Sequence, residues 1–285
     1  MSYIAAVIIA LVYGLAEILP LSGSGHLYIL LQLFGIYISK TDRLLLEAFM
    51  TLGAVITVTL VFRKQIGVMI SDTAYIISAG MEDNAERDGR FPVGTRLLIM
   101  NLISLVPVLI GALLFRKASV LADNRIFLSI AMVVSGVILY ASTFAPRGKR
   151  AVKTMRFSDA IIMGIGYAAG CLPGLSKSAL VISSGKASGV RSLFAMRYCM
   201  LLFVPCALVT AAVKAITAVL SSPTWSLLPV FLVAMVLSAV GAFAALAVYD
   251  RILRNKGLKY CSYYLMLFGV AMLVLYFILP HTYVM

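Results

Sequence analysis

The chain has 285 residues, of which 62% are hydrophobic and only 12% charged, and its formal net charge is +13. Soluble domains average roughly 45–50% apolar and about 25% charged residues, so these figures exclude an ordinary soluble domain. They equally exclude a disordered, collagen-like or coiled-coil chain and a secreted disulfide scaffold. The composition predicts an all-α polytopic membrane protein.

The apolar segments, taken in chain order, are of two kinds. A spanning helix needs ~20 largely apolar residues. The chain opens with a region that a polar break divides, formed by residues 4–19, 20–25 and 26–38. A second divided region consists of residues 158–172, 173–177 and 178–190. Six undivided segments are each expected to span the membrane once: Leu44–Phe62, Leu97–Phe115, Ile126–Ala145, Leu193–Ile216, Leu227–Tyr249 and Tyr260–Leu279.

The two breaks resemble each other. Leu19-Pro20-Leu21-Ser22-Gly23-Ser24 and Leu172-Pro173-Gly174-Leu175-Ser176-Lys177-Ser178 share a Leu-Pro pair followed by alternating serines. Pro, Gly and Ser end a helix and free backbone polar groups, which cannot face lipid. Similar interruptions in two halves of a chain indicate an inverted repeat with a binding site between them. We therefore predict six transmembrane helices plus two re-entrant helical hairpins, in a single membrane domain over residues 1–285. Its repeat halves are about 1–145 and 158–285, joined by a basic cytoplasmic loop at 146–157.

The basic residues predict the orientation. If each hairpin enters and leaves on one side, 17 of the 24 Lys and Arg residues lie on one side and 6 on the other, including Lys214, while Lys177 lies in a break. The richer side is expected to be cytoplasmic, with both chain ends outside. Basic residues in short runs between apolar segments are typical of topogenic charge, so no nucleic-acid partner is expected.

Few ionisable residues lie at membrane depth, where they are costly and mark function. They are Glu17, His26, Glu47 and Lys177. If the hairpin tips meet, these groups converge with the hydroxyls of Ser22, Ser24, Ser176 and Ser178. Hydroxyls, free amides at helix starts and a lysine suit phosphate oxygens. A carboxylate beside them indicates proton transfer or a divalent cation, because hard cations prefer oxygen ligands.

Each of these residues also has a structural alternative. His26 is compatible with a helix-start histidine bonded to the backbone, and Glu17 with a protonated carboxyl bonded to a neighbouring helix. Lys177 has the alternative of extending to a surface, and Glu47 that of a helix-packing partner. Serines in membrane helices often bond to backbone or bridge helices.

The run Gly14-Leu15-Ala16-Glu17-Ile18-Leu19-Pro20-Leu21-Ser22-Gly23-Ser24-Gly25-His26-Leu27 resembles the first signature of the bacitracin-resistance-type undecaprenyl-diphosphatase family, E-G-L-T-E-F-L-P-V-S-S-T-G-H-L. Leu172-Pro173-Gly174-Leu175-Ser176-Lys177-Ser178-Ala179 resembles its second, W-P-G-x-S-R-S-G. Leu46-Glu47 with Leu52-Gly53 is similar to a third stretch, F-E-x-x-I-Q-L-G. The resemblance covers nearly the whole chain.

This resemblance implies hydrolysis of undecaprenyl diphosphate to undecaprenyl phosphate and inorganic phosphate, which recycles the carrier lipid for cell-wall synthesis. It implies a multi-pass enzyme of the bacterial inner membrane that uses a divalent cation, Mg or Ca, with a homodimer left open. The expected catalytic residues are His26, Glu17, Ser22 and Ser24. Phosphate binding is expected from Lys177, Ser176, Ser178 and Gly174, and cation binding from Glu17 and Glu47.

The chain departs from the family pattern at five positions. Tyr13 replaces a glutamate, Gly23 a serine, Ser24 a threonine, Lys177 an arginine and Arg197 a later glutamate. The lysine keeps the charge but loses the bidentate geometry of arginine. These losses favour an alternative function, a non-hydrolytic transporter or flippase of polyprenyl phosphate or a related anionic lipid. Retention of Glu17 and His26 favours hydrolysis, because transport needs no such pair. The sequence leaves open the lipid chain length, the cation, the oligomeric state and the side of substrate entry.

Overall fold

The computed structural model describes residues 3–79, 91–254 and 257–278, and over these residues the regular structure is helical. Six helical segments are long and apolar enough to cross a membrane. They coincide with the six predicted spans, with ends that differ by a few residues. The helices are α3 (Lys40–Val61), α6 (Val93–Leu114), α7 (Arg125–Ser142), α10 (Ser192–Leu220), α11 (Leu228–Arg254) and α12 (Gly257–Ile278), and the one-turn helix η2 (Trp225–Leu227) leads into α11.

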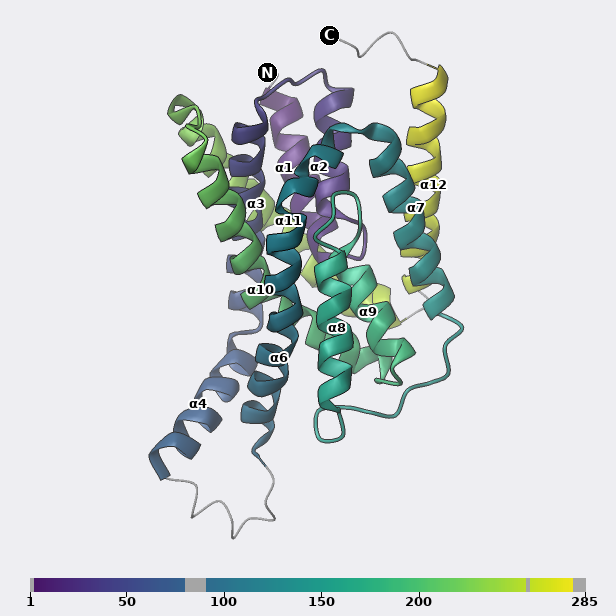
Figure 1. Ribbon diagram of the computed structural model, residues 1–285. Coiled ribbons are helices and arrows are strands. Elements are labelled where there is room, and N and C mark those ends of the chain that lie inside the picture. The colour runs from purple at the N-terminus through teal and green to yellow at the C-terminus, as the bar shows by residue number, and fades with distance from the viewer. Residues whose placement is uncertain (1–2, 80–90, 255–256, 279–285) are drawn as a thin grey trace.

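The two divided regions each form a pair of shorter helices. The first pair is α1 (Tyr3–Ile18) and α2 (Gly23–Leu33), and the second is α8 (Phe157–Ala169) and α9 (Lys177–Ala187). Each connection contains the predicted proline, and each second helix begins after a serine that caps it. None of these helices reaches the ~20 residues that a span requires. In Figure 1 both connections lie in the middle of the molecule.

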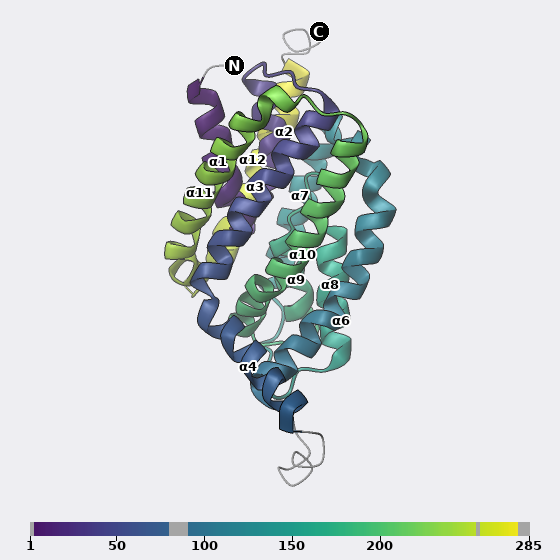
Figure 2. The same ribbon diagram turned by 90° about the vertical axis from the view of Figure 1, so that its left-hand side faces the viewer.

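Two helical segments were not predicted. Helix α4 (Arg63–Ala79) lies where the sequence indicated only a connection, and η1 (Phe115–Asp123) continues from the end of α6. Helix α4 packs on α6, and its Asp72 accepts a hydrogen bond from the backbone amide of Gly94 at 2.8 Å. Figures 1 and 2 place α4 at the end of the molecule opposite to the start of α1 and the end of α12. The acidic stretch that follows α4, around Glu82 and Asp88, lies outside the described residues.

The helices contact one another in related pairs. Helix α1 packs along α11 and α8 along α6, while α7 packs along α12 and α3 along α10. Small residues permit the close approaches. A Cβ on Gly14 of α1 would overlap the carbonyl oxygen of Ser238 on α11, and a Cβ on Gly164 of α8 would overlap that of Ser104 on α6. These contacts hold the two short helix pairs against the long helices.

The outer surface of the long helices is apolar. Phe243 is 62% exposed, Leu267 70% and Leu113 67%, although all three lie within helices of spanning length. A soluble protein would turn such a surface inward, whereas lipid solvates it. The charged residues Glu17, Glu47 and Lys177 are instead buried inside the protein. The chain is therefore a multi-pass membrane protein.

Candidate active site

The connections of the two short helix pairs touch through reciprocal hydrogen bonds. The hydroxyl of Ser22, before α2, donates to the carbonyl oxygen of Leu175 at 3.2 Å. The hydroxyl of Ser178, in α9, donates to the carbonyl oxygen of Leu19 at 3.1 Å. Each connection thus satisfies a backbone carbonyl of the other, which an apolar surrounding would leave unpaired at a cost.

The two helix starts that meet here are capped in the same way. Ser22 accepts a hydrogen bond from the amide of Gly25, and Ser176 accepts one from the amide of Ala179. Ser22 has a positive φ of 68°, and Gly174 has one of 84°. A non-glycine residue in this region costs about 1–3 kcal/mol and such strain gathers at functional sites. At Gly174 the close approach of Ala131 and the carbonyl of Leu128 would also exclude a side chain.

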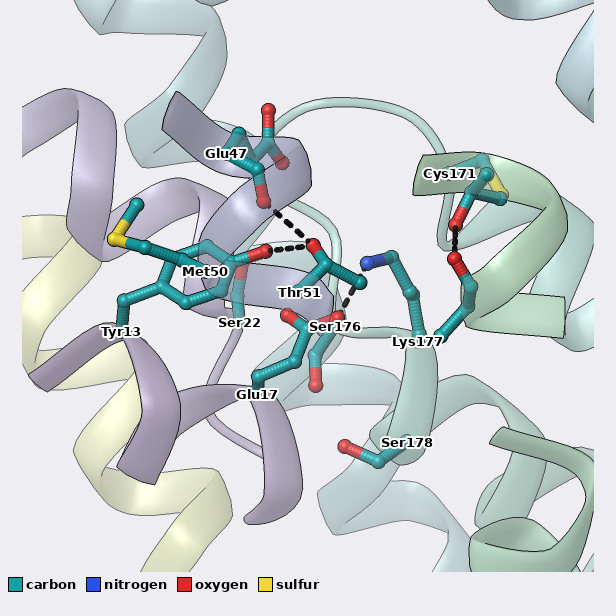
Figure 3. Close-up of polar contacts among 12 residues, drawn as sticks. Tyr13, Glu17, Ser22, Glu47, Met50, Thr51, Cys171, Ser176, Lys177 and Ser178 are labelled. Atoms are coloured by element: carbon teal, nitrogen blue, oxygen red, sulfur yellow. Dashed lines mark hydrogen bonds and ion pairs between the residues drawn. The ribbon is translucent and has the colours of Figure 1, made fainter. Parts of the chain in front are cut away.

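Lys177 and Glu17 form a buried ion pair across the two connections. Nζ of Lys177 lies 2.5 Å from Oε1 of Glu17, and their side chains are 9% and 4% exposed. Figure 3 shows the Lys177 side chain extending from the start of α9 towards Glu17 at the end of α1. Removing one partner of a buried pair leaves an uncompensated charge, which typically costs about 3–5 kcal/mol. The pair therefore ties the first divided region to the second.

A pocket of about 60 Å³ lies beside this ion pair. The first turns of α2 and α9 contribute Ser24 and Lys177 to its wall, α3 contributes Glu47, and α10 contributes Lys214. The other lining residues are Tyr28, Leu44, Ala112, Phe115, Cys171, Pro173, Thr210, Val213 and Thr217. Two helix N-termini and two ammonium groups favour an anion in this pocket.

Glu47 is fully buried and has two partners. Oε2 accepts a hydrogen bond from the hydroxyl of Tyr28 at 2.6 Å, and Oε1 lies 2.5 Å from Nζ of Lys214. This second contact is an ion pair in distance, but Oε1 accepts no hydrogen bond of good geometry from the described residues. The Glu47 backbone carbonyl accepts from Thr51, whose side chain is also 2.7 Å from the hydroxyl of Tyr13. Figure 3 shows Glu47 and Lys177 on neighbouring elements around the same interior region.

His26 does not line this pocket, although it belongs to the same helix as Ser24. Its Nδ1 lies 2.8 Å from the carbonyl oxygen of Ser22, and its Nε2 lies 2.8 Å from the hydroxyl of Tyr264 on α12. The ring also stacks on Phe268, with centroids 4.7 Å apart. His26 therefore combines the backbone contact that the structural alternative anticipated with an aromatic environment formed by α12.

The structure brings several predicted site residues together and separates others. Glu17 contacts Lys177, while Ser24, Glu47 and Lys177 line one pocket. The described contacts of the other three serines are with the polypeptide: Ser22 and Ser178 donate to carbonyls, and Ser22 and Ser176 cap helices. Gly174 shapes its connection and does not line the pocket. The catalytic, phosphate-binding and cation-binding roles of these residues stay predictions.

Sequence reasoning missed three contributors to this region. Lys214 was counted only among the charges of the less basic side and not among the ionisable residues at membrane depth, whereas α10 continues to Leu220 and pairs Lys214 with buried Glu47. The signal for Lys214 was a single lysine inside an apolar run of spanning length. Tyr28 and Tyr264 gave no comparable signal, because tyrosines are common in membrane helices. Their partners, Glu47 and His26, lie on other helices.

Two departures from the family pattern, Tyr13 and Arg197, do not line the pocket. Tyr13 is fully buried and its hydroxyl bonds Thr51, so a neutral hydrogen-bonding group occupies this position. Arg197 is exposed near the start of α10 and does not line the pocket.

An α-helical bundle of spanning helices that encloses buried charges and an anion-favouring pocket defines a polytopic membrane protein with an interior polar site. The sequence model of the family described as "Bacitracin resistance protein BacA" matches residues 6–271. The chain belongs to this family. It is 26% identical over 270 residues to a protein of Oceanobacillus iheyensis named undecaprenyl-diphosphatase, covering 94% of each chain. Proteins with the same name from Mycobacterium sp. (strain KMS) and Carboxydothermus hydrogenoformans are 29% and 28% identical over 278 residues each, covering 95–97% of the chains.

Proposed function

We propose that this protein is an undecaprenyl-diphosphatase, which hydrolyses undecaprenyl diphosphate to undecaprenyl phosphate and inorganic phosphate. The observation that carries the proposal is the buried pocket at the start of α2 and α9, where Lys177 lies between a paired carboxylate and an anion-favouring cavity. Membership in the family and relatives of that name along almost the whole chain support it.

The pocket has the chemistry that phosphoryl transfer requires. In direct hydrolysis a water oxygen forms a bond to the terminal phosphorus and gives its proton to a base, the bond from that phosphorus to the bridging oxygen breaks, and the bridging oxygen keeps the electron pair on the lipid phosphate. If a histidine nitrogen attacks first, the same bond to the bridging oxygen breaks, and water then displaces the histidine from phosphorus. Positioning and electrostatic stabilisation supply most of the acceleration in such reactions. Lys177, the hydroxyl of Ser24 and the amides at the two helix starts are the groups that offset the charge on the phosphate oxygens. Glu17 holds the Lys177 ammonium group in place.

His26 remains our candidate for the nucleophile or general base. Both roles need a neutral ring with a free nitrogen. Because Tyr264 contacts Nε2, substrate entry would have to displace its hydroxyl from the imidazole. The experiment is a His26→Ala variant, for which we expect turnover to fall roughly 10²- to 10⁴-fold, the usual contribution of a general acid or base. Unchanged turnover by a folded variant would remove His26 from the mechanism.

A divalent cation, Mg or Ca, is part of the proposal, and two buried carboxylates fit it in kind, Glu47 in the pocket wall and Glu17 beside the pocket, paired with Lys177. The fully buried Oε1 of Glu47 accepts no well-formed hydrogen bond from the part of the chain that the structure describes, so it is the oxygen that a hard cation would take, with Glu17 as the second carboxylate. Each carboxylate is paired with a lysine, so cation binding requires an ammonium group to move. When both pairs are charged they sum to zero, so a diphosphate brings uncompensated negative charge. A bound cation would offset this charge and polarise the phosphate.

Re-entrant hairpins in an inverted repeat explain the arrangement of the helices. Two pairs of short helices, too short to span, turn back in the interior of the molecule (Figure 1). A two-fold relation would interchange α1 with α8, α6 with α11 and α7 with α12. The contacts agree with it: α1 packs on α11 as α8 packs on α6, and α7 packs on α12. A Cβ on Gly136 of α7 would crowd the carbonyl of Ser262 on α12, and one on Gly269 of α12 would crowd that of Ser129 on α7. This reciprocity supports halves near 1–145 and 158–285 with the loop 146–157 between them.

The lipid carrier and the bacterial inner membrane follow from the proposed reaction, and the charge bias puts the loop 146–157 in the cytoplasm. A larger pocket of about 740 Å³ shares Tyr28 with the site and is lined by Tyr37, Arg43, Asn124 and Arg125. These residues lie near the ends of α2 and α7 that face away from α4 (Figure 1). We expect the head group and water to enter from this outer side.

Phosphate release from undecaprenyl diphosphate by the purified full-length protein tests the function directly. We expect release with undecaprenyl diphosphate and none with undecaprenyl phosphate. The transporter alternative predicts no release, together with movement of undecaprenyl phosphate across the bilayer of vesicles that contain the protein. The relatives carry the name of a hydrolase, so this alternative is the less favoured.

A further inference from the structure

Lys214 is the cationic side chain on the α10 wall of the pocket. It lies within a helix of spanning length, where a charged side chain is costly and marks a functional position. Its side chain is 23% exposed, whereas the Glu47 side chain with which it pairs is 0% exposed. The Lys214 side chain therefore retains accessible surface while lining the pocket.

The contact with Glu47 leaves the Lys214 ammonium group available to a ligand. Nζ of Lys214 is 2.5 Å from Oε1 of Glu47, yet within residues 3–79, 91–254 and 257–278 no hydrogen bond of good geometry reaches that oxygen. The other oxygen of Glu47 is engaged by Tyr28. An ammonium group has three donors, so Lys214 can keep its charge contact with Glu47 and donate to an anion in the pocket. Glu47 and Tyr28 then position Lys214 in the absence of substrate.

Lys177 and Lys214 come from different walls of this pocket. Lys177 begins α9, beside the start of α2, whereas Lys214 lies on α10. Lysines bind phosphate as point charges, and two of them on separate walls suit an anion with two phosphate groups. We propose that Lys214 is the second phosphate-binding residue, so that Lys177 and Lys214 each hold one phosphate group of the diphosphate.

This assignment rests on the proposed function for the identity of the lipid and deepens it at one point. It makes Lys214 the residue that distinguishes a diphosphate head group from a monophosphate. A monophosphate occupies one lysine and leaves the other paired with its glutamate. If Lys214 serves only to join α3 to α10, the two head groups are not distinguished by its removal.

The test is binding of inorganic pyrophosphate and of orthophosphate to the purified full-length protein, in the presence of a chelator so that no divalent cation contributes. Binding is read from the rise in melting temperature with ligand concentration. For Lys214→Gln we expect the dissociation constant for pyrophosphate to rise roughly 10- to 100-fold, as for loss of a charged hydrogen bond. The dissociation constant of the same variant for orthophosphate is expected to change less than about threefold, well below the change for pyrophosphate.

Three further variants control this measurement. Lys214→Arg keeps the charge and is expected to keep most of the preference for pyrophosphate. The double variant Glu47→Gln with Lys214→Gln removes both charges, so it tests the proposal if the single variant leaves buried Glu47 unpaired and does not fold. Lys186→Gln removes one half-buried lysine of α9 that does not line the pocket, and is expected to bind both anions as the unaltered protein does.

Equal losses for pyrophosphate and orthophosphate, no loss for either, or the absence of pyrophosphate binding by the unaltered protein would each overturn the assignment of Lys214. The proposed function fails separately. If the protein binds pyrophosphate through Lys214 but releases no phosphate from undecaprenyl diphosphate, the proposed function is wrong and the assignment of Lys214 stands.

Discussion

Nε2 of His26 accepts a hydrogen bond from the hydroxyl of Tyr264, with 2.8 Å between the two atoms. The direction of this bond follows from the other ring nitrogen. Nδ1 lies 2.8 Å from the carbonyl oxygen of Ser22, which can only accept, so Nδ1 carries the proton in the neutral ring. Tyr264 thus occupies the nitrogen that would accept a proton or attack phosphorus, while the Ser22 carbonyl fixes the tautomer in which that nitrogen is unprotonated.

Removing only the Tyr264 hydroxyl should therefore free His26. In Tyr264→Phe the ring that stacks near the imidazole is kept, so we expect turnover to fall by no more than about tenfold or to rise, because loss of one neutral hydrogen bond costs only about 0.5–1.5 kcal/mol. Tyr264→Leu, which also removes the aromatic ring, should lower the melting temperature. Phosphate release and thermal unfolding, measured on both variants, separate the two effects. A large loss of turnover in Tyr264→Phe would instead make the hydroxyl part of the reaction.

The fold was largely predictable, because its main determinant is local. Six runs of apolar residues match the lipid thickness, and two Pro, Gly and Ser breaks divide the remaining apolar regions. Helix α4 was missed because its mixed composition carries no spanning signal, and its contacts with α6 come from tertiary packing.

Site residues were predictable from the sequence where they lie within or next to one of the two breaks. Lys177 lies inside a break and Glu17 directly before one, so their meeting follows if the breaks meet. Lys214, which pairs with Glu47, and Tyr264, which contacts His26, lie on α10 and α12, more than 160 positions further along the chain. Their approach is set by helix packing, which no local pattern specifies. For the same reason the sequence did not indicate Lys214 as a partner of Glu47.

At the Lys177–Glu17 pair, a substitution that keeps the positive charge and one that removes it should have different effects on turnover and stability. Lys177→Arg restores the residue type of the family pattern, so we expect turnover within about tenfold of the unaltered protein if the larger head group finds room. Lys177→Met should lower stability by about 3–5 kcal/mol, because it leaves the Glu17 carboxylate buried and unpaired. The double variant Glu17→Gln with Lys177→Met should recover stability but not turnover. Recovery of turnover as well would show that the pair is structural only.

At Gly23, restoring the serine of the family pattern should lower both turnover and stability. A Cβ at this position would overlap Oε2 of Glu17 and crowd its backbone. Gly23→Ser should therefore displace the Glu17 carboxylate from Lys177 and lower both turnover and melting temperature, by about 1–3 kcal/mol of unfolding free energy for an overpacked position. Gly67→Ala in α4 is the matched control, since no atom lies within 4 Å of its added Cβ. That variant should be neutral or stabilising by up to about 1 kcal/mol.

Cation dependence should be governed by Glu47. If its Oε1 is a cation ligand, a chelator should lower phosphate release and added Mg²⁺ or Ca²⁺ should restore it. Glu47→Gln should raise the cation concentration needed for half-maximal release by at least the roughly 10- to 100-fold that loss of an outer-shell partner causes. Asp42→Asn is the control: Asp42 is a carboxylate of the same helix that binds Thr224 and does not line the pocket.

Glu47→Gln and Asp42→Asn make the same change in net charge on α3, so a general electrostatic effect would shift the cation requirement of both variants equally. A ligand role shifts it for Glu47→Gln alone. Phosphate release that a chelator leaves unchanged would contradict the cation expectation altogether. In that case the positive charge that meets the diphosphate comes from Lys177, Lys214 and the two helix starts, and Glu47 acts only by holding Lys214 against the pocket wall.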